Sequence, residues 1–202
     1  MKKIFLARHG QTDANNTLTY QGHIDNPLNN KGLLQAKKLA AYFREEPLAR
    51  IYTSDLVRTV ETAQPTSELL NAEIVKIPSF KEINFGEWEG LTYEEIKKRW
   101  PKDIEDFFHR PATIKISGGE SFKEVQERAW ASFQEVVASH GGDESLLIVS
   151  HGGTVRTLLC AIMNLDLNEM WKISIDNAGI SCILQLENRC WIKNINDTYF
   201  LK

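Results

Sequence analysis

This 202-residue sequence lacks long apolar runs and has few cysteines. The first apolar run, residues 4–7, ends at Arg8, whereas a secretory signal needs roughly 7 to 15 apolar residues. No run approaches the ~18 residues that indicate a membrane-spanning helix. The three cysteines form no CxxC motif and leave at least one thiol unpaired, which is typical of a reducing compartment. We therefore expect a cytoplasmic protein with free thiols and no membrane partner.

A strong excess of charge of either sign is also missing. The net charge is -3, with 24 basic and 27 acidic residues, so we expect no polyanion-binding surface and no nucleic-acid partner. The five histidines show neither HxH nor HExxH spacing, and the sequence contains no G-x-S-x-G motif. We therefore expect no metal, no cofactor and no serine nucleophile.

The strands that the sequence predicts are short. A chain of this length with 42% hydrophobic residues suits one domain, which we assign to residues 1–202. Apolar segments at 4–7, 51–53 and 146–149 predict buried strands, and 180–186 and 190–195 predict two extended runs joined by a turn. Since helical segments separate the first strands, we expect a three-layer α/β/α fold, in which helices cover both faces of a largely parallel sheet.

Helical spacing is clearest in the segment 31–46, where apolar residues recur at Leu33, Ala36, Leu39, Ala40 and Phe43. A helix at 55–70 is expected to begin at a cap formed by Thr53 or Ser54. The segment 152–163 predicts a further helix after the third strand.

Two capping boxes predict helices at 92–100 and 121–139, because Thr92 pairs with Glu95 and Ser121 with Glu124. The segment between these helices contains two prolines, two glycines and a brief helical stretch. We expect it to form a cap-like excursion from the main layers, at about 92–120.

Basic side chains and histidines follow three of the predicted elements at the point where a strand ends. Arg8 and His9 follow the first strand, Arg58 begins the helix after the second, and His151 follows the third. Ligands of open parallel sheets bind at the carboxyl ends of strands. Taken singly, Arg8 could be a solvated strand end, Arg58 an exposed helix charge and His151 a satisfied loop histidine. The coincidence of four such residues at strand ends favours a phosphate site. Gly152 adds a backbone N–H at a helix N-terminus.

Phosphoryl transfer at such a site needs a nucleophile and an acid. A neutral imidazole is a permitted nucleophile, and either His9 or His151 qualifies. Glu82, Glu87 and Glu89 all lie in one aromatic, glycine-containing loop and are candidates for the acid. Burial would raise the pKa of such an acid and adjacent arginines would lower it, so the chemistry leaves the choice among the three open.

The motifs RHGQTDAN, YQGHIDNPLNNKGLLQA, IYTSDLVRTVETA, KEINFGEWEG, GGES and IVSHGG, in this order, resemble those of the histidine phosphatase superfamily, the phosphoglycerate-mutase-like proteins. The resemblance extends from residue 3 to about residue 163. It implies a Rossmann-like α/β fold and a two-step phosphoryl transfer that needs no metal or cofactor.

The resemblance also assigns roles to residues. His9 becomes the nucleophile that carries the phosphoryl group, and Glu82 becomes the proton donor and acceptor. It places the other matched residues around the phosphoryl group and the substrate, namely Arg8, Arg58, His151, Asn15, Gln21, Gly22 and Gly152. Glu87 and Glu89 are then structural or peripheral.

Within this family the alternatives are a phosphatase and a phosphoglycerate mutase. Mutases carry a longer insertion with paired arginines, whereas the excursion here is short and offers Arg110 without an arginine neighbour, which favours hydrolysis. The expected substrates are small-molecule phosphomonoesters, with α-ribazole phosphate, phosphoserine and a range of metabolite phosphates as candidates. A non-catalytic sensor of phosphorylated ligands is a third hypothesis.

Two aromatic regions are candidates for contacts with the substrate or with a partner chain. Trp100, Phe107, Phe108 and His109 are candidates for an apolar wall over the leaving group, although such spacing more often indicates core. Trp171 and the C-terminal pair of extended runs offer an apolar surface on which a homodimer is possible.

Overall fold

A computed structural model describes residues 1–187 and 189–202 of the chain. It contains one six-stranded sheet in the order β3-β2-β4-β1-β5-β6. Its strands are β1 (Lys2–Arg8), β2 (Leu48–Thr53), β3 (Ile74–Lys76), β4 (Ser145–Ser150), β5 (Ile180–Leu186) and β6 (Arg189–Asp197). The first four strands are parallel, and β5 and β6 form an antiparallel hairpin beside β1. The expected α/β fold with a largely parallel sheet is therefore confirmed.

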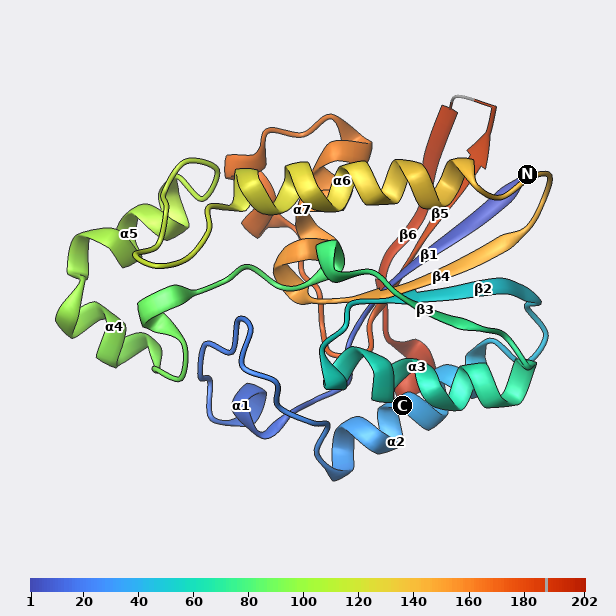
Figure 1. Cartoon of the computed structure of the whole chain (residues 1–202), viewed down its shortest axis with the longest axis horizontal. Helices are drawn as coiled ribbons and strands as arrows, with labels where there is room; N and C mark the ends of the chain where they lie inside the picture. The colour runs from blue at the N-terminus through green and yellow to red at the C-terminus, as the bar shows by residue number, and fades with distance from the viewer. Residues whose placement is uncertain (188) are drawn as a thin grey trace.

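Helices cover both faces of this sheet. The longer helices are α2 (Asn30–Tyr42), α3 (Val57–Leu70), α6 (Phe122–Ala138) and α7 (Gly152–Met163). Figure 1 shows α6 and α7 on one face and α2 and α3 on the other. Because both faces are covered, all six residues of β4 are buried, and its sequence SLLIVS reads as one apolar run closed by serines.

The helix predicted from spacing in 31–46 forms as α2, with the Asn29 side chain accepting from the Gly32 N–H at its N-terminus. Leu39 and Phe43 are fully buried, but Leu33 is 44% exposed and does not belong to the core face. The helix predicted at 152–163 has the expected bounds, and both capping boxes form as expected.

The start of α3 differs from the expectation. Neither Thr53 nor Ser54 caps it: the helix begins at Val57, and its cap position, Leu56, has no capping side chain. Ser54 Oγ instead lies 2.8 Å from His151 Nε2. The Val57 N–H donates to Asp25 Oδ1 at 2.7 Å, so a distant loop supplies the cap.

The segment between the capping boxes lies outside the three main layers. It contains α4 (Tyr93–Arg99) and α5 (Pro101–His109), which lie beyond one end of the sheet (Figure 1). Phe107 of α5 is buried beside Trp88 and Phe122, so the excursion shares the core of the domain. The remaining elements are short: α1 (Asp13–Asn16), η1 (Pro78–Phe80), η2 (Gly86–Trp88), η3 (Leu167–Lys172) and η4 (Tyr199–Leu201).

The sheet places its switch point between β1 and β4. These neighbouring parallel strands pair through Arg8 and Ser150, and the helices that follow them, α2 and α7, lie on opposite faces (Figure 1). A crevice opens where consecutive connections diverge in this way, at the carboxyl ends of the strands. This is where the sequence places both candidate nucleophiles.

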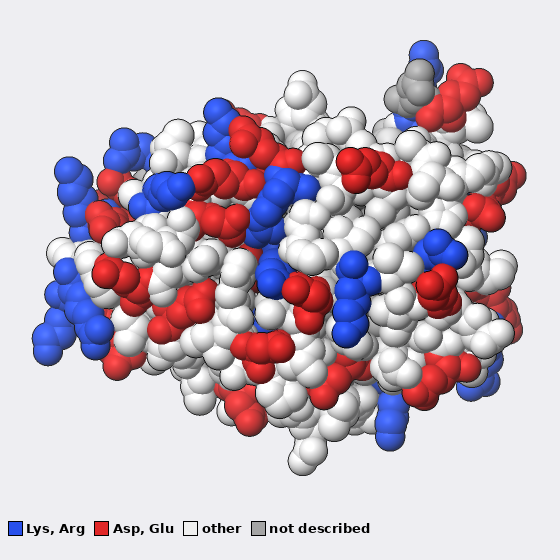
Figure 2. All heavy atoms as spheres, in the orientation of Figure 1, with Lys and Arg blue, Asp and Glu red and all other residues white. Residues whose placement is uncertain are grey.

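The surface carries no charge patch of one sign on the face drawn in Figure 2, where acidic and basic side chains are interspersed. Among the described residues, no helix is both long and apolar enough to cross a membrane.

Candidate active site

The predicted convergence at the strand ends is present. Arg8 closes β1, His9 follows it, Arg58 is the second residue of α3, and His151 precedes α7. The imidazole centroids of His9 and His151 are 5.2 Å apart. Both rings are almost completely buried, as is Arg58. Three segments that are distant in sequence therefore bring two imidazoles and two guanidinium groups close together.

The ring of His9 is held with one nitrogen engaged. His9 Nδ1 lies 2.7 Å from Gly10 O, which can only accept, so Nδ1 carries the proton and Nε2 keeps its lone pair. Burial, then Arg58 and Arg8, hold the pKa of His9 well below its usual value. His9 is therefore a neutral imidazole whose Nε2 has no hydrogen-bond partner in the part of the chain that the structure describes, which is the state that a nucleophile requires.

His151 has both ring nitrogens engaged. Arg58 Nε donates to His151 Nδ1 at 3.2 Å, and Nε2 contacts the Ser54 hydroxyl at 2.8 Å. Burial and the neighbouring Arg58 lower the pKa of His151. Because His151 has no unengaged nitrogen, the geometry distinguishes the two candidate nucleophiles and favours His9.

The two arginines differ in how they are held. Arg58 Nη1 and Nη2 donate to Ile24 O at 2.8 Å and Gly22 O at 2.7 Å, so the loop before α2 fixes the guanidinium. Arg8 Nη1 donates to Ile175 O, whereas its buried Nε has no partner among residues 1–187 and 189–202. Burial lowers the pKa of each arginine to about 10, so both remain charged at neutral pH. A buried unpaired donor of this kind is expected where an anion binds.

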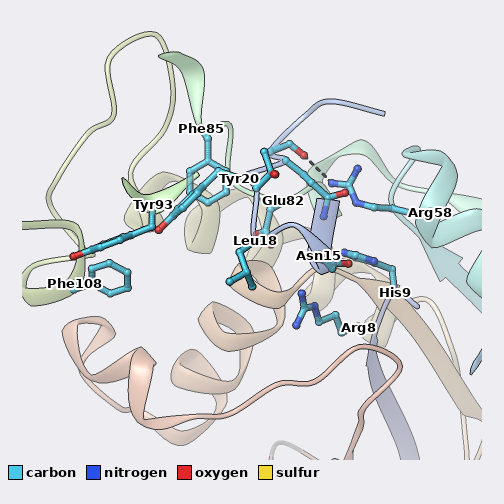
Figure 3. A pocket seen from close by; sticks show the side chains of 13 residues that line it. Arg8, His9, Asn15, Leu18, Tyr20, Arg58, Glu82, Phe85, Tyr93 and Phe108 are labelled. Carbon is cyan, nitrogen blue, oxygen red and sulfur yellow. Dashed lines mark hydrogen bonds between the residues drawn. The ribbon is translucent and has the colours of Figure 1, made fainter. Parts of the chain in front are cut away.

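Thr12 orients two amide side chains beside these cations. The Thr12 N–H donates to Asn15 Oδ1 at 3.1 Å, and the Thr12 hydroxyl donates to Gln21 Oε1 at 2.9 Å. Because their oxygens are engaged, Asn15 and Gln21 direct their NH₂ groups elsewhere, and both residues line the same cavity as His9 (Figure 3). Gly22 also lines this cavity, in a left-handed conformation with φ of 52°.

Asn177 is a residue of this site that the sequence analysis missed. Its Nδ2 donates to Asn15 Oδ1 at 3.1 Å, and it also lies 3.2 Å from His9 O and 3.4 Å from Gly10 O. Gly10 O is the acceptor that fixes the His9 ring. The only sequence signal is a turn-forming DNAG just before β5, which indicates a loop but not the strand end it contacts.

Glu82 lines the same cavity as Arg8 and Arg58. Its Oε2 accepts from the Gly153 N–H at 3.0 Å, and its Oε1 accepts from the Ile83 and Thr154 N–H groups at 3.0 Å and 3.2 Å. The carboxylate therefore sits at the N-terminus of α7, where the helix dipole and free N–H groups favour it.

The other two carboxylates of the loop lie away from the cavity. Glu89 Oε1 accepts from the His23 and Phe85 N–H groups and so holds the loop together. Glu87 is exposed. Of the three candidates, only Glu82 lines the cavity.

The cavity has two ends of different character. Figure 3 shows Arg8, His9, Asn15 and Arg58 at one end and an aromatic wall of Tyr20, Phe85, Tyr93 and Phe108 at the other, with Glu82 between them. Its volume is about 410 Å³. A second cavity of about 300 Å³ shares Arg8 and Glu82 and continues toward Phe107, Trp171 and Gly152. One end suits an anion and the other a larger organic group.

Of the four residues considered for an apolar wall, two line a cavity of the site and two do not. Phe108 lines both cavities and Phe107 lines the second, although Phe107 is itself buried core. Trp100 packs against the core, and His109 is exposed, with Nδ1 on Glu105 O. Neither residue lines either of these two cavities. Trp171, a candidate for a partner surface, is partly buried and packs with a tilted ring against both phenylalanines.

In the described part of the chain, no three His, Cys, Asp or Glu side chains gather in a way that suits a metal ion. The three cysteines are free thiols.

The chain is similar to known phosphatases over its whole length. It is 35% identical to phosphoserine phosphatase 1 of Hydrogenobacter thermophilus over 201 residues, which cover 100% of this chain and 95% of that protein. The structure of YhfR from Bacillus stearothermophilus superimposes with a TM-score of 0.95, at 30% identity and full coverage of both chains. Phosphoserine phosphatase of Entamoeba histolytica, solved with 3-phosphoglyceric acid, gives a TM-score of 0.90 at 26% identity, again with full coverage.

The sequence model of one protein family matches residues 4–198, which is almost the entire chain. That family is the one whose six motifs the sequence resembles, and its members transfer phosphoryl groups through a histidine. The site geometry, the relatives and the matched family agree, so the resemblance is confirmed. The chain belongs to the histidine phosphatase superfamily (branch 1) and is a phosphoric monoester hydrolase.

Proposed function

We propose that His9 is the nucleophile of this phosphatase and that Glu82 is its general acid and base. One observation carries the proposal: the buried, neutral ring of His9 has its free Nε2 in a cavity that also contains Arg8, Arg58 and Asn15. These groups can hold the three equatorial oxygens of a phosphoryl group in the transition state. His151, fixed by Ser54 and Arg58, completes the enclosure.

In the first step, the Nε2 lone pair of His9 forms a bond to phosphorus as the ester P–O bond breaks. Glu82, protonated, gives its proton to the departing oxygen, so an alcohol leaves rather than an alkoxide. His9 Nδ1 keeps its proton throughout and donates it in the hydrogen bond to Gly10 O. The N–H groups of Gly153 and Thr154 hold the resulting carboxylate.

In the second step, water enters the place that the alcohol has left. Glu82 takes a proton from this water as its oxygen attacks phosphorus and the N–P bond breaks. Inorganic phosphate leaves, and the lone pair returns to His9 Nε2. One carboxylate suffices for both steps because the leaving oxygen and the attacking oxygen occupy the same side of the phosphorus.

We propose one domain over residues 1–202, in which the excursion at about 92–120 acts as a cap over the leaving group. Tyr93 and Phe108 of the cap line the cavity, together with Tyr20 and Phe85. Substrates are small phosphomonoesters; the names of the relatives support phosphoserine, and α-ribazole phosphate and other metabolite phosphates are further candidates.

The proposed alternatives, a mutase and a sensor, receive less support. Arg110, the one cap arginine considered for a substrate carboxylate, pairs with Asp106 on the surface and does not line either cavity. A sensor would need the anion-binding end of the cavity but not the positioned carboxylate of Glu82.

We further propose a cytoplasmic location and assembly as a homodimer through the C-terminal hairpin. The free thiols support the former. The exposed Trp191 on β6, the outer strand of the sheet, supports the latter. Light scattering of the purified chain measures the oligomeric state, and a monomer mass at micromolar concentration would refute the dimer.

The experiment for the main proposal is hydrolysis of 4-nitrophenyl phosphate in EDTA. The protein should release phosphate, His9→Ala should lose turnover, and His109→Ala, which removes a surface imidazole, should not. Conversion of 3-phosphoglycerate to 2-phosphoglycerate faster than its hydrolysis would support the mutase instead. Undiminished hydrolysis by His9→Ala would refute the nucleophile.

A further inference from the structure

The second cavity contains an arginine that the proposed phosphoryl transfer does not use. Arg156 lies on α7, one helical turn after Gly152, and lines this cavity together with Glu82, Phe107, Phe122 and Trp171. It does not line the end of the first cavity that holds His9. It is therefore a cation on the side of Glu82 where the leaving group departs.

Its guanidinium is held in place from one side. Arg156 Nε donates to Ile173 O at 2.8 Å, and Nη1 donates to Gly152 O at 3.0 Å. The group also lies over the Trp171 ring at 5.6 Å. Within residues 1–187 and 189–202, Nη2 has no hydrogen-bond partner, so one edge of the planar group is available to a ligand.

Arg156 also lies close to the phosphoryl end. A Cβ added at Gly152 would lie 3.2 Å from Arg156 Nη1 and 3.4 Å from Arg8 Nε, so the two guanidinium groups flank the same glycine. Burial, and after it the charge of Arg156, lower the pKa of Arg8, which agrees with the closeness of the two guanidinium groups. A substrate whose phosphoryl group contacts Arg8 would therefore place its leaving group beside Arg156.

The charges of the cavity walls are unbalanced at this point. Across both cavities the charged side chains are Arg8, Arg58 and Arg156 against the single carboxylate of Glu82. When Glu82 is protonated for its role as an acid, nothing in the walls offsets Arg156. Asp176 also acts on Arg156, but its carboxylate accepts from Asn196 and lies in neither wall. An anion on the leaving group would restore the balance.

We infer that Arg156 binds a carboxylate on the leaving group, so that the preferred substrates are phosphorylated hydroxy acids or hydroxy amino acids. One free guanidinium edge presents the parallel donors that a planar, singly charged carboxylate accepts. A second phosphoryl group is a poorer match, because the phosphoryl end of this cavity uses two arginines. This inference rests on the proposed function and assigns the substrate class of the same site.

Matched substrate pairs test the inference in the unmodified protein. O-phosphoserine carries a carboxylate where O-phosphoethanolamine has a hydrogen, and 3-phosphoglycerate carries a carboxylate where glycerol 3-phosphate has a hydroxymethyl group. We expect kcat/KM to favour the carboxylated member of each pair by about tenfold or more, because hydrogen bonds to charged groups are the stronger ones. A ratio near one, or a preference for the member without the carboxylate, would overturn the inference.

Variants assign the effect to the residue. Arg156→Met should bring both ratios toward one, and Arg156→Lys, which keeps the charge, should retain part of the preference. Arg110→Met is the matched control: it removes a surface arginine of the cap, and both ratios should stay at their original values. If Arg156→Met does not fold, Arg156→Lys and the substrate ratios of the unmodified protein still decide the question. Unchanged ratios in a folded Arg156→Met would overturn the assignment.

Failure of this inference is distinguishable from failure of the proposed function. If none of the four substrates and no 4-nitrophenyl phosphate is hydrolysed in EDTA, the phosphatase proposal fails. If all are hydrolysed at similar kcat/KM, only the carboxylate site fails.

Discussion

Asn177 Nδ2 donates to Asn15 Oδ1 at 3.1 Å, although 162 positions separate the two residues in the sequence. Because this contact engages the Asn15 oxygen, the Asn15 NH₂ group remains available to the cavity that Asn15 lines. The same Asn177 NH₂ lies 3.4 Å from Gly10 O, the acceptor for His9 Nδ1. One side chain from the loop before β5 therefore orients both an anion donor and the proposed nucleophile.

Loss of this contact should weaken anion binding more than it weakens the fold. For Asn177→Ala we expect the inhibition constant of inorganic phosphate to rise about tenfold, the equivalent of ~1.4 kcal/mol. Asn177→Asp should be worse, because its second oxygen would face Asn15 Oδ1 and turn the Asn15 amide away. Inhibition kinetics and thermal melts measure the two effects. Unchanged phosphate inhibition in either variant would show that Asn177 only supports the loop.

Gly153 is the position where a single methyl group should disturb the proposed acid. An added Cβ would lie 2.5 Å from Glu82 Oε1 and 2.6 Å from Phe122 Cε1. Since a displacement of about 1 Å can cost ~100-fold in rate, Gly153→Ala should lower kcat for alkyl phosphates by about that factor.

The matched control is Gly141→Ala, because a Cβ there meets no atom within 4 Å. Its kcat should equal that of the original protein. If Gly153→Ala hydrolyses alkyl phosphates at an unchanged rate, Glu82 does not need the position that the structure gives it.

Glu82→Gln separates binding from proton transfer. The amide keeps the size of the side chain but cannot give up a proton to the leaving oxygen. We expect kcat for an alkyl phosphate to fall by about 10²- to 10⁴-fold, the range typical of general acid catalysis. An aryl phosphate, whose leaving group needs no proton, should be affected much less. Equal losses for both esters would argue against the acid role.

The two buried histidines should make the fold sensitive to acid. Burial lowers the pKa of His9 and of His151 below the 6.5 of the unfolded chain. Their contribution to stability is therefore fully present above about pH 6.5 and is lost as the pH falls from there toward the lower folded pKa values. Each proton taken up on unfolding costs at most ~1.4 kcal/mol per pH unit.

Thermal melts between about pH 7.5 and 5 measure this dependence. The melting temperature should fall below about pH 6.5, and the slope should be shallower in His9→Gln, which takes up one proton fewer. Identical slopes in the two proteins would mean that His9 is not buried as a neutral group.

The sequence predicted where the candidate site residues lie better than it predicted the strand and the contacts that hold them in place. The strand ends at Arg8, His9 and His151 were recognisable because short apolar runs stop abruptly there. Strand β3 was missed because its three residues, Ile74–Lys76, are only partly buried and carry no alternation long enough to notice.

The supporting contacts were not predictable because they join distant segments. Ser54 was expected to cap α3, but its hydroxyl contacts His151, and Asp25 caps the helix instead. Likewise, nothing near Asn177 indicates that it meets Asn15. Local propensity predicts elements, whereas the orientation of a site depends on pairs that only the fold brings together.

The most direct test of the account is the trapping of a phosphoenzyme. The protein is mixed with phosphate-labelled substrate, quenched within milliseconds, and digested for mass spectrometry under alkaline and acidic conditions. We expect one phosphorylated peptide, modified at His9, stable in alkali and lost in acid, and absent from His9→Ala. A phosphopeptide that survives acid, or one that persists in His9→Ala, would contradict the central claim.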